Sequence, residues 1–179
     1  MSDLACRLAG SSVGAAQGRP WAALSARPQR RLAILRRFRR IALVGVSANP
    51  LRPSHFVAVY LANRGYDIVP VNPLASSVLG RPCHPSLHAV PQPVDIVGIF
   101  RPPRFVPAIV EQAIQVGASV VWMQFGIVHE EAALHARDAG LEVVMDQCLK
   151  VEHARFFGGL SPLGLNGGWS PEDGRHSLR

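Results

Sequence analysis

Residue types that could bind an anion gather in the loop after the first apolar run of the chain. Gly45 lets the backbone approach a ligand, Ser47 and Ser54 offer hydroxyl groups, and the Arg52 guanidinium can form two parallel hydrogen bonds with a phosphate. A helix expected to follow the loop, with Ser54 as its N-cap, would direct free N–H groups towards it. The dinucleotide motif G-x-G-x-x-G is absent, because Ser47 and Pro50 occupy the second and third glycine positions. We predict a phosphate-binding loop, and an ordinary strand-to-helix turn with a capping serine stays open as the alternative.

The residues after the second and third apolar runs bear on which ligand would bind. NAD enzymes usually carry Asp or Glu after the second strand, where the carboxylate binds the ribose 2′-hydroxyl. This chain has Asn72 and Pro73 there, so an NAD ribose would lack its usual partner. Arg101, which follows the third run, is typical of an anion-binding residue, and pairing with Asp95 or Asp146 would explain it equally well.

Patterns associated with catalysis are missing. Seven histidines are present, yet Cys83, His84 and His88 have no further ligand pair at a metal-ligand spacing. The motifs G-x-S-x-G and H-E-x-x-H and the P-loop lysine motif do not occur. The sequence therefore assigns no catalytic residue and no metal ligand.

A repeated unit of strand, loop and helix must position these residues. From residue 41 onward, short apolar runs alternate with amphipathic segments, and Gly65, Gly117 and Gly140 stand where three expected helices end. Runs that are continuously apolar indicate strands buried on both faces. The sequence predicts an α/β fold, a Rossmann-like doubly wound five-stranded parallel sheet in a single domain. The expected strands are 41–46, 67–71, 94–100, 119–124 and 141–145, with helices that include 29–38, 130–139 and 149–156.

The excess positive charge of the chain, +7 at pH 7, belongs to its first 40 residues. They hold nine arginines and one acid, whereas the remainder holds ten basic and eleven acidic residues. A nucleic-acid-binding domain would spread its basic residues over structured elements, so this distribution argues against that function. We expect a disordered basic leader over 1–30, a folded domain over 31–157 and a flexible Gly/Pro/Ser-rich tail over 158–179. The absence of a long apolar stretch and of C-x-x-C pairs favours a soluble, cytoplasmic protein with no membrane contact.

Four short motifs follow one another in this order: VNP, FR, W-x-Q-x-G-I and D-x-C-x-x-x-E-H. They lie in the segments GYDIVPVNP, VDIVGIFRPP, VVWMQFGI and AGLEVVMDQCLKVEH, which come after IALVGVSANPLRPS. Over about residues 33–156, the sequence resembles the small stand-alone CoA-binding proteins, relatives of the CoA-binding domain of succinyl-CoA synthetase α subunits. The resemblance implies that coenzyme A, or an acyl-CoA, lies across the carboxyl ends of the strands.

The resemblance also implies which residues would bind this ligand. The first loop would hold the phosphates, the end of the second strand would flank the adenosine, and the next two strand ends would line the groove. The implied residues are Gly45, Ser47, Arg52 and Ser54 for the phosphates, Val71, Asn72 and Pro73 for the adenosine, and Phe100, Arg101, Gln124 and Gly126 for the groove.

Two of the residues near this groove have alternative explanations. Gln124 shares a strand face with Trp122, and it either lines the groove or caps a neighbouring loop. Cys148 follows the fifth run near an expected helix N-terminus, where a thiolate is stabilised. The thiol of bound CoA could reach Cys148 and form a mixed disulfide under oxidation, whereas free cysteines more commonly serve as small buried hydrophobic residues.

The expected protein is a non-catalytic CoA-binding module, either a monomer or a homodimer. Two enzymatic alternatives stay open. An NAD(P)-dependent oxidoreductase would use the same fold, but the absent glycines and the absent acid after the second strand argue against it. A CoA ligase or transferase subunit would need a partner chain, because the phosphorylated histidine of the synthetase belongs to a second domain.

Overall fold

Five parallel strands form the centre of the molecule in a computed structural model that describes residues 20–91 and 93–158. Their order across the sheet is β2-β1-β5-β6-β7, which is typical of a doubly wound fold. All five are parallel to their neighbours, and their residues are mostly buried, which explains their continuously apolar sequences. The strands are β1 (Arg40–Val44), β2 (Asp67–Val71), β5 (Ile96–Ile99), β6 (Val120–Met123) and β7 (Glu142–Val144).

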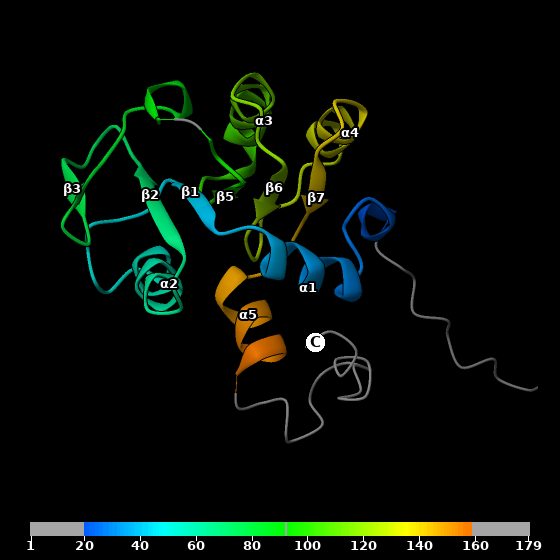
Figure 1. Cartoon of the computed structure of the whole chain (residues 1–179). Helices are drawn as coiled ribbons and strands as arrows, with labels where there is room; N and C mark the ends of the chain where they lie inside the picture. The colour runs from blue at the N-terminus through cyan, green and yellow to red at the C-terminus, as the bar shows by residue number, and fades with distance from the viewer. Residues whose placement is uncertain (1–19, 92, 159–179) are drawn as a thin grey trace, which may run out of the picture.

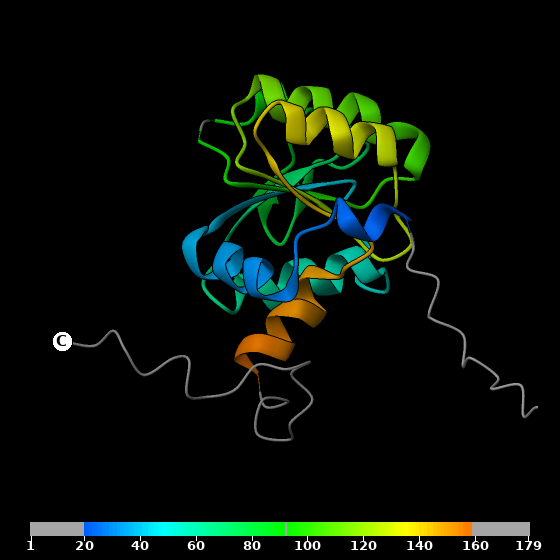
Figure 2. The same cartoon turned by 90° about the vertical axis from the view of Figure 1, so that its right-hand side faces the viewer.

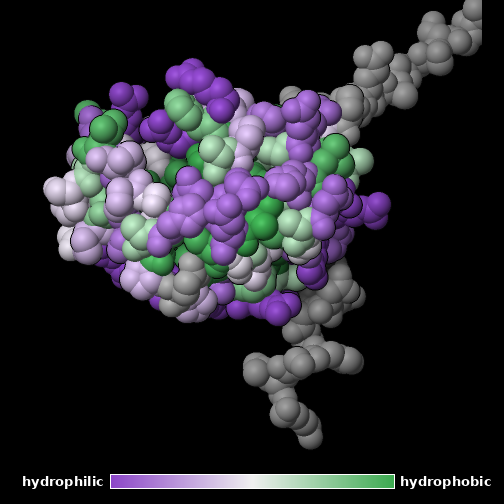
Figure 3. Space-filling view, turned by 90° about the horizontal axis from the view of Figure 1, so that it is seen from above, coloured by the Kyte–Doolittle hydropathy of each residue, from purple (hydrophilic) through white to green (hydrophobic). Residues whose placement is uncertain are grey.

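Helices cover both faces of this sheet (Figures 1 and 2). One layer consists of α3 (Val106–Gln115) and α4 (Glu130–Asp138), and the other consists of α1 (Pro28–Arg37), α2 (Pro53–Ala62) and α5 (Leu149–Phe157). The strands supply a separate core to each layer because their side chains alternate between the two faces. Seen from the side of α3 and α4, hydrophilic residues cover much of the outer surface (Figure 3).

The register of the strands brings their carboxyl ends to one edge. Val44 of β1 lies opposite Val71 of β2 and Ile99 of β5, and Ile99 lies opposite Met123 of β6. The connection from β1 runs to β2 on one side, whereas β5 pairs with the other side of β1, so the strand order reverses there. Ligands of open parallel sheets bind at such a reversal.

The smaller elements were not predicted in full. An antiparallel hairpin joins β3 (Ser77–Val78) to β4 (Arg81–Pro82) beyond the end of β2, and the turn expected near residues 86–89 is the 3₁₀ helix η2 (Leu87–Ala89). Two further 3₁₀ helices, η1 (Pro20–Ala23) and η3 (Pro103–Phe105), complete the fold. Within the described parts of the chain, no helix has the length and apolar character needed to cross a membrane.

Residues 20–30, which the sequence placed in a disordered leader, fold against the edge of the sheet (Figure 1). The Ala26 N–H donates to the Val143 carbonyl, and the Met145 N–H donates to Ser25 Oγ. Trp21 and Leu24 pack against the core beneath α3 and α4. The expected domain start at residue 31 is therefore too late, because the segment covers the otherwise open edge of β7. The rest of the expected leader and nearly all of the expected tail lie outside the described residues.

A cluster of aromatic rings surrounds His153 on α5. The Tyr60 hydroxyl and His153 Nδ1 are 3.1 Å apart, and the ring centroids of Tyr66 and His153 are 5.5 Å apart. Burial of the ring, followed by the nearby guanidinium groups of Arg64 and Arg39, holds the pKa of His153 below its ordinary value of 6.5. The cluster therefore favours the neutral imidazole.

The lowered pKa of His153 predicts a stability that depends on pH. The unfolded chain takes up a proton on His153 near pH 6.5, while the folded chain resists it. The free energy of unfolding should be fully retained above that pH and fall as the pH drops through the lowered pKa. Urea denaturation between pH 7.5 and 5 should show this slope in the natural protein and a flatter profile in His153→Gln. The exposed control His88→Gln should keep the natural slope, and equal slopes in all three proteins would contradict the prediction.

Candidate functional site

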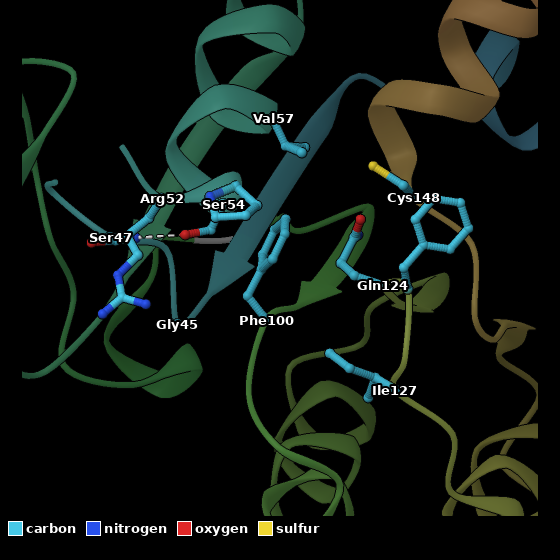
Figure 4. A pocket seen from close by; sticks show the side chains of 11 residues that line it. Gly45, Ser47, Arg52, Ser54, Val57, Phe100, Gln124, Ile127 and Cys148 are labelled. Carbon is cyan, nitrogen blue, oxygen red and sulfur yellow. Dashed lines mark hydrogen bonds between the residues drawn. The ribbon is translucent and has the colours of Figure 1, made fainter. Parts of the chain in front are cut away.

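A pocket of about 430 Å³ opens at the carboxyl edge of the sheet, where the strand order reverses (Figure 4). The ends of β1, β5 and β6 contribute to it, together with the first turn of α2 and the start of α5. Seven of the twelve ligand-binding residues predicted from the sequence line this pocket. They are Gly45, Ser47, Arg52, Ser54, Phe100, Gln124 and Cys148, and Pro53, Val57, Phe125 and Ile127 complete the lining.

The first loop turns sharply at Gly45, whose φ of +85° is a left-handed conformation that glycine adopts without strain. A Cβ atom at this position would lie 2.7 Å from the Arg101 Cδ atom and 3.2 Å from the Phe100 carbonyl oxygen. The Gly45 N–H donates to the Val71 carbonyl at 2.8 Å, so the turn is held against β2. Gly45 therefore permits the carboxyl ends of β1 and β5 to approach each other closely.

The hydroxyl groups of the two serines both accept hydrogen bonds from backbone N–H groups of the loop. The Ser47 N–H donates to Ser54 Oγ at 3.1 Å, and Ser47 Oγ accepts from the Asn49 N–H. Ser54 was expected to be the N-cap of α2, but it lies inside the helix, whose N-cap is Arg52. The reason is Pro53, which fits the first helical position because it has no N–H to satisfy. The hydroxyl of Ser54 thus fixes the loop from within the helix.

Arg52 supplies the only charge in the pocket lining. Its side chain is exposed, and it forms no ion pair with any residue of the described chain. In Figure 4 it stands on the same side as Ser47, opposite Gln124 and Cys148. One end of the pocket is therefore cationic, and an anion bound there would meet no competing acid in the lining.

Gln124 lies at the other end, where its side chain is 4% exposed. Its Oε1 atom accepts a hydrogen bond from the Leu149 N–H at 3.1 Å, which satisfies the first turn of α5. Its Nε2 atom is buried and has no acceptor among the described residues. Gly98 on β5 leaves room for Leu43 and Leu149, because a Cβ there would lie 2.8 Å from Leu43 Cδ2 and 3.2 Å from Leu149 Cδ1, and 3.7 Å from Gln124 Nε2. Gln124 therefore caps the start of α5 and also lines the pocket.

A loop held by Asp146 forms the wall beyond Gln124. Asp146 adopts a φ of 52°, which is uncommon outside glycine but tolerated by aspartate. Its Oδ1 atom accepts from the Gly126 N–H at 2.8 Å, and its own N–H donates to the Ile127 carbonyl. Phe125 is thereby presented at the pocket, with 58% of its surface exposed. The sequence motif contained Asp146, but its part in positioning this wall was missed.

Cys148 is the N-cap residue of α5, as its predicted place near a helix start requires. Its side chain is partly buried and lines the pocket beside Gln124 (Figure 4). Phe100, Val57 and Ile127 provide the neighbouring apolar surface. The pocket thus changes along its length from hydroxyls and a guanidinium to apolar side chains, an amide and a thiol.

Five predicted residues lie outside the pocket lining: Val71, Asn72, Pro73, Arg101 and Gly126. Val71 belongs to the core under α3 and α4. Asn72 Nδ2 donates to the Val46 carbonyl, and Asn72 Oδ1 accepts from the Leu74 N–H. The Arg101 guanidinium lies 4.4 Å from the ring centroid of Phe105, while the Asp95 carboxylate accepts from backbone N–H groups at residues 39 and 40. Gly126 belongs to the Asp146-bound loop.

Four lining residues were not predicted: Pro53, Val57, Phe125 and Ile127. Each of them is apolar or aromatic, so no residue type distinguished it from the core. For Phe125 and Ile127, the signal was their place on either side of Gly126, within the motif W-x-Q-x-G-I. Val57 lies one helical turn after Pro53, on the face of α2 that meets the sheet.

Comparison with known proteins identifies relatives of this fold and site. The chain is 42% identical over 121 residues to the Bacillus subtilis (strain 168) protein named "Uncharacterized protein YneT", which covers 68% of this chain and 90% of that protein. A solved structure titled "hypothetical protein from Pyrococcus horikoshii OT3" matches with a TM-score of 0.73 and 41% identity, over 75% of this chain and 95% of that one. A third relative is "Acetate--CoA ligase [ADP-forming] I" of Archaeoglobus fulgidus, 32% identical over 72 residues, which are 40% of this chain and 10% of the ligase.

A family model supplies the remaining comparison. The model described as "CoA binding domain" matches residues 39–154, which include every element from β1 to most of α5 and every residue that lines the pocket. A match over more than half of the chain, together with a five-stranded parallel sheet of the order found here, identifies the family. This chain belongs to the CoA-binding domain family.

Proposed function

We propose that the protein binds coenzyme A, or an acyl-CoA, in the pocket at the strand ends and acts as a non-catalytic binding module. The observation that carries this proposal is the change of chemistry along the pocket, from Arg52 with two serines to an apolar wall with Gln124 and Cys148. Coenzyme A changes in the same way, from anionic phosphates to an uncharged pantetheine arm that ends in a thiol. A phosphate would bind the guanidinium, and the arm would lie along Phe100.

The lining residues fit such a ligand. The uncharged end of the pocket is lined by apolar side chains and by Gln124, whose amide suits a ligand that carries uncharged polar groups. Cys148 would then lie near the sulfur end of the ligand. A molecule as long as coenzyme A exceeds this pocket, so its adenosine would extend over the neighbouring strand ends. The adenosine would contact Asn72, Pro73 and Arg101, which lie outside the pocket lining.

A second candidate is a CoA ligase subunit that works with a partner chain. The observation in its favour is the match to the acetate–CoA ligase, of which this chain corresponds to only 10%. Binding of CoA would be common to both candidates. The oxidoreductase alternative receives no such support, because the end of β2 offers Asn72 and Pro73 in place of an acid.

The proposal predicts a selective response to ligands and to the loss of Arg52. Calorimetric titration should show binding of CoA and acetyl-CoA, weaker binding of 3′-dephospho-CoA, and no binding of NAD or NADP. Arg52→Ala should weaken CoA binding by about tenfold to a hundredfold, because a charge-assisted hydrogen bond contributes about 1.5–3 kcal/mol. Arg104→Ala is the matched control, since Arg104 is exposed outside the pocket, 4.7 Å from the Phe105 ring centroid. Binding of NAD without CoA, or equal affinities in both variants, would contradict the proposal.

A further inference from the structure

A backbone hydrogen bond from α5 fixes the orientation of the Gln124 side-chain amide. Its Oε1 atom must face α5, because it accepts from the Leu149 N–H at 3.1 Å. This fixes the NH₂ group on the other side, where it is buried without an acceptor among the residues that the structure describes. A buried donor without an acceptor lowers the stability of the fold. If Gln124 only capped α5, its amide nitrogen would bring this cost without any benefit.

The NH₂ group lies over Gly98 of β5, 3.7 Å from where a Cβ of that residue would stand, at the end of the pocket that Gln124 lines. Phe100, Ile127 and Cys148 line this end of the pocket, and the single charged lining residue, Arg52, stands at the opposite end. An anion would be attracted to Arg52 and would meet apolar surface beside Gln124. The acceptor that fits is therefore uncharged and belongs to a largely apolar group, which is the description of an amide or thioester carbonyl.

We propose that Gln124 Nε2 donates a hydrogen bond to a carbonyl oxygen on the uncharged arm of the ligand, which makes Gln124 a specificity-determining residue. This inference depends on the proposed binding of CoA or acyl-CoA in the same pocket. The carbonyl has two possible sources: an amide of the pantetheine arm, which free CoA also carries, or the thioester of an acyl group. If the thioester is the source, the site selects acyl-CoA over free CoA.

Three ligands separate these sources. Free CoA carries the pantetheine amides alone, acetyl-CoA adds the thioester carbonyl, and S-ethyl-CoA has an alkyl group of similar size without that carbonyl. Each is titrated against the natural protein and against Gln124→Met. Methionine matches the length of glutamine and retains a weak acceptor for the Leu149 N–H, but it has no hydrogen to donate. Gln147→Met, the same substitution outside the pocket lining, is the control.

We expect Gln124→Met to bind at least one carbonyl-bearing ligand about tenfold more weakly, with Gln147→Met unchanged. A loss confined to acetyl-CoA assigns the hydrogen bond to the thioester, and an equal loss for all three ligands assigns it to a pantetheine amide. Natural affinities in Gln124→Met for every ligand would overturn the inference while leaving the proposed function intact. Failure of the natural protein to bind any of the three would instead overturn the proposed function. If Gln124→Met folds poorly, Gln124→Glu replaces it, because glutamate retains an Oε acceptor for the Leu149 N–H. The order of the three ligand affinities in Gln124→Glu is then compared with their order in the natural protein.

Discussion

An Arg31→Met protein is expected to lose about 3 kcal/mol of its free energy of unfolding. The Arg31 Nε atom donates to Glu152 Oε2 at 2.6 Å, with only 9% and 2% of the two side chains exposed. Arg31 Nη1 also donates to the Ala26 carbonyl at 2.8 Å. Removing the guanidinium leaves a buried carboxylate whose remaining ionic partner is Arg155, at 3.2 Å. The loss should therefore be large but short of that for a carboxylate with no partner.

Urea denaturation at pH 7 measures this effect, and two further variants test its cause. Arg36→Met makes the same change at an exposed position of α1 and should shift stability by less than about 0.5 kcal/mol. The double variant Arg31→Met with Glu152→Leu should recover most of the loss, because two apolar side chains can replace a buried ion pair. A loss in Arg31→Met no larger than that in Arg36→Met would show that water reaches Glu152.

A Gly45→Ala protein is expected to lose about 3 kcal/mol and to bind CoA more weakly. The left-handed backbone costs alanine about 1–2 kcal/mol, and the new Cβ would lie 2.7 Å from Arg101 Cδ and 3.2 Å from the Phe100 carbonyl oxygen. The backbone oxygen cannot rotate away as a side chain can, so β1 and β5 must separate at their ends. Phe100 lines the pocket, and its displacement would alter the surface offered to the ligand.

Gly65→Ala is the matched control for this substitution. Gly65 has a φ of +82°, close to that of Gly45, yet nothing lies within 4 Å of the Cβ it would gain. It should cost only the backbone strain, about 1–2 kcal/mol, and should leave ligand affinity unchanged. Thermal or urea denaturation of both variants gives the steric contribution by difference. Equal losses would mean that the strand ends adjust freely and that Gly45 is required for its backbone conformation alone.

Gly45 and the Arg31–Glu152 ion pair both help to fix the positions of the elements that line the pocket. Gly45 lets the ends of β1 and β5 meet, and the buried pair of Arg31 and Glu152 fastens α1 to α5. The start of α5 in turn presents Cys148 and the Leu149 N–H that orients Gln124. Packing distant from the pocket therefore determines the direction of the unsatisfied Gln124 amide group in the pocket lining.

The sequence alone determined the fold and about half of the candidate site. Five continuous apolar runs separated by amphipathic segments specify a parallel sheet with helices on both faces, and β2 has the predicted bounds. The loop from Gly45 to Ser54 and the place of Cys148 at the start of α5 were also predictable. These features are local, since a glycine turn and a helix start depend on a few consecutive residues.

Only the tertiary structure decided which strand-end residues meet. Asn72 turns to the Val46 carbonyl and Arg101 to the Phe105 ring, although their positions in the sequence resemble that of Gln124. Strand order, register and the direction of each side chain past the last strand residue depend on contacts between segments far apart in the chain. The same holds for residues 20–30. Trp21 and Leu24 show no periodicity and yet pack against the core, and Ser25 and Ala26 form hydrogen bonds with the edge at β7. An open edge of backbone groups offers partners that no local pattern reveals.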